Sequence, residues 1–216
     1  MRLNIGPRDH YINNLFAPED ASLMAIRQAL RNDEKEGINV GPYEGRLLQT
    51  LIAASGVRRV VELGTLYGYS TLWMARALPE GGEIHSIEFD EGNFKKAQSL
   101  LRDTECFNKI ILHHGDALSV LPTLESSPFD MIFIDANKAG YLKYLDWAEA
   151  HIKPGGLIVG DNTFLFGHVI GEGNNSNMSE NTIATMKQFN QRLANPEKYV
   201  SVLVPTQEGL TVAVKL

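Results

Sequence analysis

Alternation of strand-like and helix-like segments is the feature of this sequence that most restricts its possible folds. From Arg58 onward, short runs of apolar and β-branched residues recur, separated by segments in which apolar residues have helical spacing. The expected strands span residues 58–63, 83–88, 109–114, 129–135 and 157–160, and the expected helices between them span 68–78, 90–103, 116–124 and 140–152. Strands that are apolar on both faces belong to a parallel sheet covered by helices. The pattern therefore predicts an α/β protein with a Rossmann-like, mostly parallel sheet.

The two ends of the chain depart from this alternation. At the N-terminal end, helical spacing of apolar residues predicts helices over 9–16, 18–30 and 43–55. After Asp161, a helix near 180–194 is followed by strands over 199–204 and 210–215. Because the link between these two strands is short, they should form an antiparallel hairpin. The complete sheet would then have seven strands, with helices on both faces.

A glycine- and asparagine-rich segment at 163–181 is too long for an ordinary connection, and we expect it to be a mobile lid. A chain of 216 residues is expected to form a single domain, 1–216. Its expected parts are N-terminal helices at 1–56, a binding core at 57–162, the lid at 163–181, and a helix and hairpin at 182–216.

Composition excludes several classes of protein. The net charge of −6 disfavours a chain built to bind nucleic acid phosphates. The single Cys106 excludes an internal disulfide framework and a cysteine zinc cluster. No apolar run approaches the roughly 18 residues of a membrane span, and the first residues show no secretory signal. We therefore expect a cytoplasmic protein that does not bind membranes and for which nucleic acid is a disfavoured partner.

The stretch from Val60 to Thr71 combines a buried strand, a turn with glycines at positions 64 and 68, and the start of a helix. Open α/β sheets bind ligands at such turns, where glycine permits close approach of the backbone and helix N–H groups favour electron-rich atoms. The turn lacks the G-x-G of dinucleotide-binding proteins, so a smaller adenosine-bearing ligand suits it better. The alternative interpretation is an ordinary strand-to-helix turn.

Two further positions support an adenosine-bearing ligand. Glu88 ends the second expected strand, where a carboxylate can accept hydrogen bonds from both hydroxyls of a ribose. Asp116 and Ala117 follow the third strand and would flank the adenine. The alternatives are a surface acid for Glu88 and a helix N-cap for Asp116.

Oxygen ligands gather at two other strand ends. Asp135 ends the strand at 129–135, and Asp161-Asn162 follow the next strand, at the edge where α/β sheets bind ligands. Two carboxylates and an amide carbonyl form a hard ligand set that suits Mg²⁺ or a similar ion and not zinc. Three protein ligands would leave positions for water and two substrate oxygens. The alternative is that these residues only cap the helices that follow.

On these motifs the chain resembles S-adenosylmethionine-dependent, metal-dependent O-methyltransferases of the catechol and caffeoyl-CoA type, bacterial branch. The resemblance runs from about Ile38 to Asn162 and includes the C-terminal hairpin. Residues 38–41 resemble the family's cofactor-closing loop, and 62–65 with 68–70 resemble its first motif. The resemblance implies a class I methyltransferase fold. It also implies cofactor contacts from Val40, Glu62, Gly64, Thr65, Ser70, Glu88, Asp116, Ala117 and Asp135.

The same resemblance implies the chemistry. Asp135, Asp161 and Asn162 would hold a divalent cation, with Mg²⁺ expected and Mn²⁺ or Ca²⁺ as alternatives. Lys138, three residues beyond Asp135, matches the family's base and would take the proton of the acceptor hydroxyl, so Lys138 and Asp135 are the expected catalytic residues. Family members also suggest a homodimer, with the N-terminal helices in its interface.

The acceptor stays open at this point. A phenolic vicinal diol is the family's usual acceptor, but a protein carboxylate or a hydroxylated RNA base could use the same metal. Asn137 stands where animal catechol enzymes have an aromatic residue, and the segment 164–168 does not match the substrate-recognition segments of the plant enzymes. Phe164, Phe166 and His168 are candidates for the acceptor pocket or for simple packing. A nucleotide-dependent oxidoreductase and a non-catalytic adenosine-binding protein are the rival classes.

Overall fold

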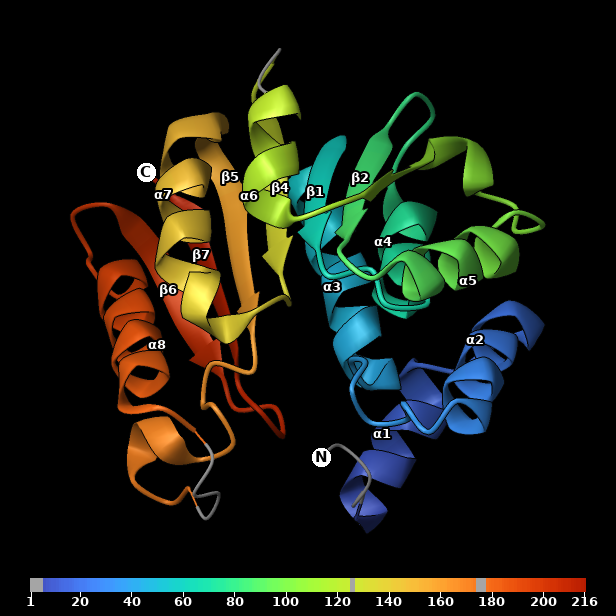
Figure 1. Ribbon diagram of the computed structural model, residues 1–216, viewed down its shortest axis with the longest axis horizontal. Coiled ribbons are helices and arrows are strands. Elements are labelled where there is room, and N and C mark those ends of the chain that lie inside the picture. Colours follow the sequence, from blue (N-terminus) through green and yellow to red (C-terminus); the bar gives the residue numbers. More distant parts are fainter. Residues whose placement is uncertain (1–5, 125–126, 174–177) are drawn as a thin grey trace. The chain divides into compact units, whose positions relative to one another are not determined.

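The computed structural model describes residues 6–124, 127–173 and 178–216 (Figure 1). The chain forms two compact units, each built from two segments. The first unit comprises Met1–Arg59 and Thr65–Asp116, and the second comprises Val60–Gly64 and Ala117–Leu216. The expected single domain with its four parts stays a prediction.

The first unit contains the N-terminal helices and two strands. Its elements are α1 (Pro7–Phe16), α2 (Ala21–Asn32), α3 (Pro42–Ser55), α4 (Tyr69–Ala77), β2 (Glu83–Glu88), α5 (Glu91–Leu101), the 3-10 turn η1 (Phe107–Lys109) and β3 (Ile110–His114). Side-chain caps set two of the helix starts: Asp20 accepts from the N–H of Leu23 and Asp90 from that of Asn93. Helix α3 ends at Gly56, whose φ of 62° is the left-handed conformation typical of a helix end.

The second unit contains the remaining strands. Its elements are β1 (Arg59–Leu63, of which Arg59 belongs to the first unit), α6 (Ala117–Val120), η2 (Leu121–Leu124), β4 (Phe129–Ile134), η3 (Lys138–Gly140), α7 (Tyr141–His151), β5 (Ile152–Asp161), η4 (His168–Ile170), α8 (Glu180–Leu193), β6 (Tyr199–Val204) and β7 (Leu210–Lys215). Helices α7 and α8 pack against each other, α7 also packs on β4 and β5, and α8 on β7 (Figure 1).

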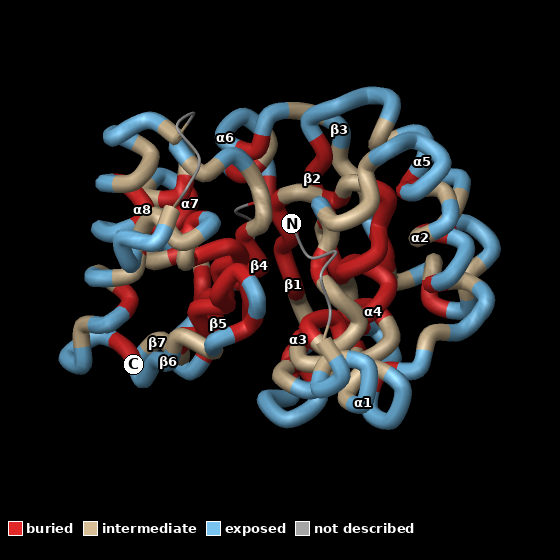
Figure 2. Tube along the Cα trace, turned by 90° about the horizontal axis from the view of Figure 1, so that it is seen from below, coloured by how far each residue is buried: buried red, intermediate tan, exposed pale blue. Residues whose placement is uncertain are grey.

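The strands form one seven-stranded sheet in the order β3-β2-β1-β4-β5-β7-β6. The pairs β2–β3, β1–β4 and β4–β5 are parallel, whereas β5–β7 and β6–β7 are antiparallel. This confirms the predicted α/β fold with a mostly parallel sheet and an antiparallel C-terminal hairpin. In the second unit all of β4 is buried, and so is the end of β5 (Figure 2). The apolar runs in these strands reflect that burial.

Strand β5 is longer than predicted. The sequence Lys153-Pro154-Gly155-Gly156 is typical of a turn, and the sequence predicts the strand only over 157–160. The structure extends it back to Ile152, with a register irregularity between the partners of Phe129 and Met131. The residues that resemble a turn therefore form an irregular start of the strand, because pairing to β4 holds both ends of the segment.

The helix expected over 116–124 is interrupted. Residues Ala117–Val120 are α-helical, and Leu121–Leu124 form a 3-10 turn. Pro122 accounts for the change, because it lacks an N–H group and its ring clashes with the carbonyl four residues earlier. The predicted lid at 163–181 includes the η4 turn, and its residues 174–177 lie outside the described residues.

Two histidines, one on β2 and one on β3, stack on each other. From this contact we predict that the free energy of unfolding falls at acidic pH. The rings of His85 and His113 are 5.2 Å apart at 12°, with Nδ1 of His85 3.0 Å from Nε2 of His113, and Glu83 lies 3.3 Å from His85. Burial, followed by the charge on His85, lowers the pKa of His113. At pH values between this lowered pKa and the value of about 6.5 in the unfolded chain, His113 therefore binds a proton more readily in the unfolded chain than in the folded one.

The contribution of His113 to stability should accordingly be complete above about pH 6.5 and be lost as the pH falls from there through its lowered folded pKa. Urea unfolding of the wild type and of His113→Gln, at about pH 7.5 and about pH 5.5, measures this. The variant should lose less stability on acidification. Equal losses in the two proteins would show that other groups cause the acid sensitivity.

Candidate cofactor and metal site

In the first unit, the turn before α4 is held by buried polar contacts. The Oγ1 of Thr65 lies 2.5 Å from the Oγ of Ser86, and both side chains are buried. Leu66 has a φ of 50°, a left-handed conformation that is costly for a residue with a side chain and that clusters at functional sites. At Gly68, with φ 86°, a Cβ atom would lie 2.6 Å from Leu101. The backbone of this turn is therefore tightly constrained.

The side chain of Glu88 holds this turn through a hydrogen bond. Its Oε2 accepts a 2.7 Å hydrogen bond from the N–H of Leu66, and its Oε1 accepts from the N–H of Asp90 at 2.9 Å. The Nδ2 of Asn93 approaches the same Oε1 at 3.3 Å. Glu88 is only 7% exposed, so it is not the solvated surface acid of the alternative interpretation. Its two oxygens have about four acceptor sites, which leaves capacity for a ligand hydroxyl.

The other predicted residues of the first unit lie in loops and at a helix start. Val40 is buried, and its carbonyl accepts from the Nδ2 of Asn39. The next residue, Gly41, donates its N–H to Glu44 at 2.6 Å, which joins the loop at 38–41 to α3. Ser70, in the first turn of α4, is buried. Asp116 is exposed and is the last residue of the first unit.

In the second unit, the end of β1 lies against the end of β4. Glu62 is fully buried on β1 opposite Phe133. Gly64 has a φ of 99°, and a Cβ atom there would lie 2.1 Å from the carbonyl oxygen of Asp135. The N–H of Asp135 donates to Leu63 at 2.9 Å. Glycine is therefore required at 64, both for its conformation and for its close approach to Asp135.

The register of β4 and β5 sets two of the predicted metal ligands at neighbouring strand ends. Ile134 pairs with Gly160, so Asp135 and Asp161 follow on neighbouring strands, which are about 4.8 Å apart in a sheet. Asp161 is fully buried, and its Oδ1 accepts from the N–H of Asn162 at 2.8 Å. Asn162 has a φ of 54°, another left-handed residue.

Lys138 lies beside Asp135 at this strand edge. Its Nζ donates to Oδ1 of Asp135 at 2.9 Å and to the hydroxyl of Tyr141 at 2.8 Å. The two ion-pair side chains are 17% and 18% exposed, so the pair is partly accessible from solvent. The η3 turn at Lys138–Gly140 produces this arrangement, because it puts Lys138 and Tyr141 on one side of the chain.

The donor set fits a hard divalent cation. In the described part of the chain, no three His, Cys, Asp or Glu side chains gather as a metal cluster. A cation at this edge would therefore rely on two carboxylates, Asp135 and Asp161, with the amide oxygen of Asn162. Oxygen donors of this kind suit Mg²⁺, Mn²⁺ or Ca²⁺.

The first residues after Asn162 are hydrogen-bonded to the link between β6 and β7. The N–H groups of Thr163 and Phe164 donate to Gly209 and Glu208 at 3.0 and 2.9 Å. Leu165 and Phe166 both have φ near 50°, and Phe166 is 44% exposed. The ring of His168 packs so closely on Gly173 that a Cβ atom there would lie 2.4 Å away. His168 therefore packs within the segment, while Phe166 is open to solvent.

Two residues beside these sites were not predicted from the sequence. Phe89, after Glu88, is 75% exposed and offers a flat aromatic surface of the kind on which bases stack. Its only signal was a large aromatic residue directly after a strand end. Tyr141 is fully buried and bonded to Lys138, and its signal was the spacing of three residues from Lys138.

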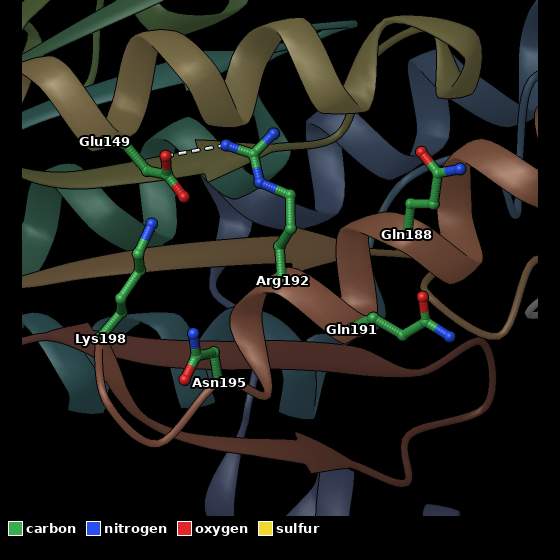
Figure 3. Close-up of a pocket in the computed structure, with 6 residues that line it drawn as sticks. All are labelled: Glu149, Gln188, Gln191, Arg192, Asn195 and Lys198. Atoms are coloured by element: carbon green, nitrogen blue, oxygen red, sulfur yellow. Dashed lines mark hydrogen bonds and ion pairs between the residues drawn. The ribbon is translucent and has the colours of Figure 1, made fainter.

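A separate cavity of about 340 Å³ lies over α7, α8 and the link to β6 (Figure 3). The residues that line it are all polar or charged types, and Glu149 and Arg192 form an ion pair of 2.8 Å. None of the predicted site residues lines this cavity, which is formed by Glu149, Gln188, Gln191, Arg192, Asn195 and Lys198.

Among the described residues, no helix has the length and apolar character needed to cross a membrane.

Comparison with known proteins agrees with this fold. The O-methyltransferase family matches residues 14–216. The solved structure of the O-methyltransferase TomG from Streptomyces achromogenes, in complex with SAM, superposes with a TM-score of 0.86 at 32% identity. That match covers 96% of this chain and 95% of TomG. An O-methyltransferase from Bacillus cereus in complex with SAH also reaches 0.86, at 31% identity over 96% and 97% of the two chains.

Two curated relatives are catechol O-methyltransferases. The chain is 36% identical over 214 residues to a catechol O-methyltransferase of Niastella koreensis, with 95% of each chain covered. It is 33% identical over 164 residues to the catechol O-methyltransferase of Mycobacterium tuberculosis, covering 76% of this chain and 74% of that one. The chain belongs to the O-methyltransferase family, and the predicted resemblance and enzyme class are confirmed.

Proposed function

We propose that this enzyme transfers the methyl group of S-adenosylmethionine to a phenolic hydroxyl of a catechol-like small molecule bound at a divalent cation. The observation that carries the proposal is the cluster at the ends of β4 and β5, where Lys138 is bonded to Asp135 and register places Asp161 alongside. Catechol O-methyltransferases among the relatives support the acceptor class, and the SAM and SAH complexes of similar structures support the cofactor.

The cofactor residues proposed here are those that the sequence predicts. In the first unit they are Val40, Thr65, Ser70, Glu88 and Asp116, and in the second they are Glu62, Gly64, Ala117 and Asp135. Glu88 is proposed to accept a hydrogen bond from a ribose hydroxyl, and the carboxylates suit a ligand that carries an ammonium and a sulfonium.

In the reaction, Asp135, Asp161 and Asn162 would hold the cation. When bound, a divalent cation supplies Lewis acidity that favours the ionised form of a phenol, whose usual pKa is about 10. For the proposed role as base, the ammonium of Lys138 would first release a proton to solvent, and its Nζ would then accept the proton of the acceptor hydroxyl. The phenolic oxygen then forms its bond to the methyl carbon as the carbon–sulfur bond breaks. The electron pair of that bond stays on sulfur, which becomes a neutral thioether. Alignment of the two reactants supplies most of the rate.

Transfer of a methyl label tests the proposal. The protein is incubated with methyl-labelled S-adenosylmethionine and a catechol acid, once with Mg²⁺ and once with chelator. Label should reach the catechol only with metal. Label that moves equally with chelator would refute the metal-dependent mechanism, and the absence of transfer to any catechol would refute the acceptor class. The same label in cell lysate would then reveal a protein carboxylate or an RNA base as acceptor. The net charge of −6 disfavours RNA.

Replacing Glu88 with glutamine should weaken S-adenosylmethionine binding about tenfold, because one charged acceptor for the ribose is lost. The kcat at saturating cofactor should stay within about twofold of the wild type, since Glu88 does not touch the transferred methyl in this proposal. Calorimetric titration and steady-state rates separate these quantities. A lowered kcat with unchanged affinity would contradict the ribose role.

We also propose a homodimer that uses the N-terminal helices. Helix α1 buries none of its residues within the chain, and Tyr11, Leu15 and Phe16 on it are each more than half exposed. A partner that covers them would remove a sizeable apolar area from water. Light scattering should give twice the chain mass, and a monomer would refute this proposal. The expected cytoplasmic location stays a prediction.

A further inference from the structure

The hydroxyl of Tyr141 joins three parts of the proposed active site. It lies 2.8 Å from the Nζ of Lys138, 2.9 Å from the carbonyl oxygen of Ile134 and 2.8 Å from the carbonyl oxygen of Asp161. Ile134 is the last residue of β4, and Asp161 is the last residue of β5. A single phenol group therefore lies within hydrogen-bond distance of both strand ends and of the lysine.

The hydrogen-bond chemistry determines the direction of these contacts. Carbonyl oxygens only accept, so the one proton of the phenol must be donated to Ile134 or Asp161. The phenol oxygen is then an acceptor, and Lys138 donates to it. The ammonium of Lys138 consequently has two specified acceptors, Tyr141 and Asp135. Two acceptors in different directions define the position of Nζ better than one.

Packing prevents the tyrosine ring from moving. Tyr141 is fully buried, and its ring meets that of Phe189 edge-on at 5.1 Å and that of Tyr144 at 6.3 Å. A Cβ atom at Gly140 would lie 2.6 Å from Tyr144, and one at Gly160 would lie 2.7 Å from Phe189. Both glycines are therefore needed for these rings to close around Tyr141. The phenol is held in place independently of any ligand.

We propose that Tyr141 is a positioning residue that acts through Lys138. It holds Nζ against Asp135, and it donates its one proton to the main chain at the end of β4 or of β5. Tyr141 does not itself touch the acceptor or the cofactor. The inference rests on the proposed function, because the lysine that it positions is the proposed base.

The test is a double-mutant cycle. Tyr141→Phe removes only the hydroxyl and should lower kcat about tenfold, with cofactor affinity from calorimetry within about twofold of the wild type. In a Lys138→Ala background the same substitution should change kcat by less than about twofold, because the residue that Tyr141 positions is gone. Equal fold-losses in the two backgrounds, or no loss in either, would overturn the inference.

Tyr199→Phe is the matched control. Tyr199 is also a buried tyrosine of the second unit, and its hydroxyl donates to Glu149 at 2.7 Å. This variant also removes a single hydroxyl that is hydrogen-bonded within the second unit, but it should keep the wild-type kcat. A loss of kcat in Tyr199→Phe as large as that in Tyr141→Phe would assign the effect to general destabilisation and overturn the inference.

A crystal structure of Tyr141→Phe separates this inference from the proposed function. If the wild type transfers no methyl group to a catechol, the proposed function fails, and the position of Lys138 still tests the inference. Its Nζ should leave Asp135 or become disordered in the variant. Retention of Nζ at its wild-type place, with equal order, would overturn the positioning role whatever the activity.

Discussion

Lys138→Ala should lower kcat for methyl transfer about 10²- to 10⁴-fold, the usual range for the loss of a positioned acid–base group. Affinity for S-adenosylmethionine should stay within about twofold, because the proposed role of Lys138 concerns only the acceptor proton. Isothermal titration measures the affinity, and transfer of labelled methyl at saturating cofactor measures kcat.

Loss of folding stability should contribute little to that fall in kcat. Lys138 and Asp135 form a partly exposed ion pair, which contributes at most about 1 kcal/mol to stability. The melting temperature of the variant should therefore change little. Removing the ammonium also leaves Asp135 without one hydrogen-bond partner. The carboxylate of Asp135 should then bind the cation more tightly, and metal titration measures this side effect.

Lys143→Ala is the matched control for this variant. Lys143 lies on α7 five residues beyond Lys138, and its side chain is exposed. The two variants remove the same charge from the same region, so a general electrostatic effect would lower both rates. Only Lys138→Ala should lose turnover. A loss of cofactor binding in Lys138→Ala, with kcat preserved, would refute its role as base.

The strand ends could be predicted from sequence because their signals are local. An apolar run that stops at an acid, as at Asp135 and Asp161, marks both a strand and its end. Parallel strands place their carboxyl ends at one edge, so the two acids could be paired before any register was known. The structure agrees: Ile134 pairs with Gly160, directly before the two acids.

The features that could not be predicted from the sequence depend on tertiary contacts. Tyr141 follows Lys138 at a spacing that many helices share, and only the packing of its hydroxyl against two strand ends distinguishes it. The early start of β5 was hidden because Pro154 and Gly155 are turn-forming residues that pairing overrides. The hydrogen bond from Leu66 to Glu88 depends on the left-handed backbone at Leu66, which no sequence pattern signals.

Gly64→Ala should have the largest effect on stability, a loss of about 3 kcal/mol, from the sum of left-handed strain and overpacking. The new Cβ would lie 2.1 Å from the carbonyl oxygen of Asp135, so one of the two must move by roughly 1 Å to reach an ordinary contact. The melting temperature should fall by about 10 °C for a chain of this size. Thermal unfolding followed by circular dichroism measures the change.

Gly155→Ala separates strain from overlap in this prediction. Gly155 also has a positive φ, 77°, but nothing lies within 4 Å of a Cβ atom there. It should lose only the conformational cost of about 1 kcal/mol, so the difference of about 2 kcal/mol between the variants measures the clash with Asp135. Because that clash displaces a proposed metal ligand, metal-dependent transfer should fall in Gly64→Ala even well below its melting temperature, and not in Gly155→Ala. Equal stabilities of the two variants would mean that the close approach of the strand ends of β1 and β4 is not what requires glycine at position 64.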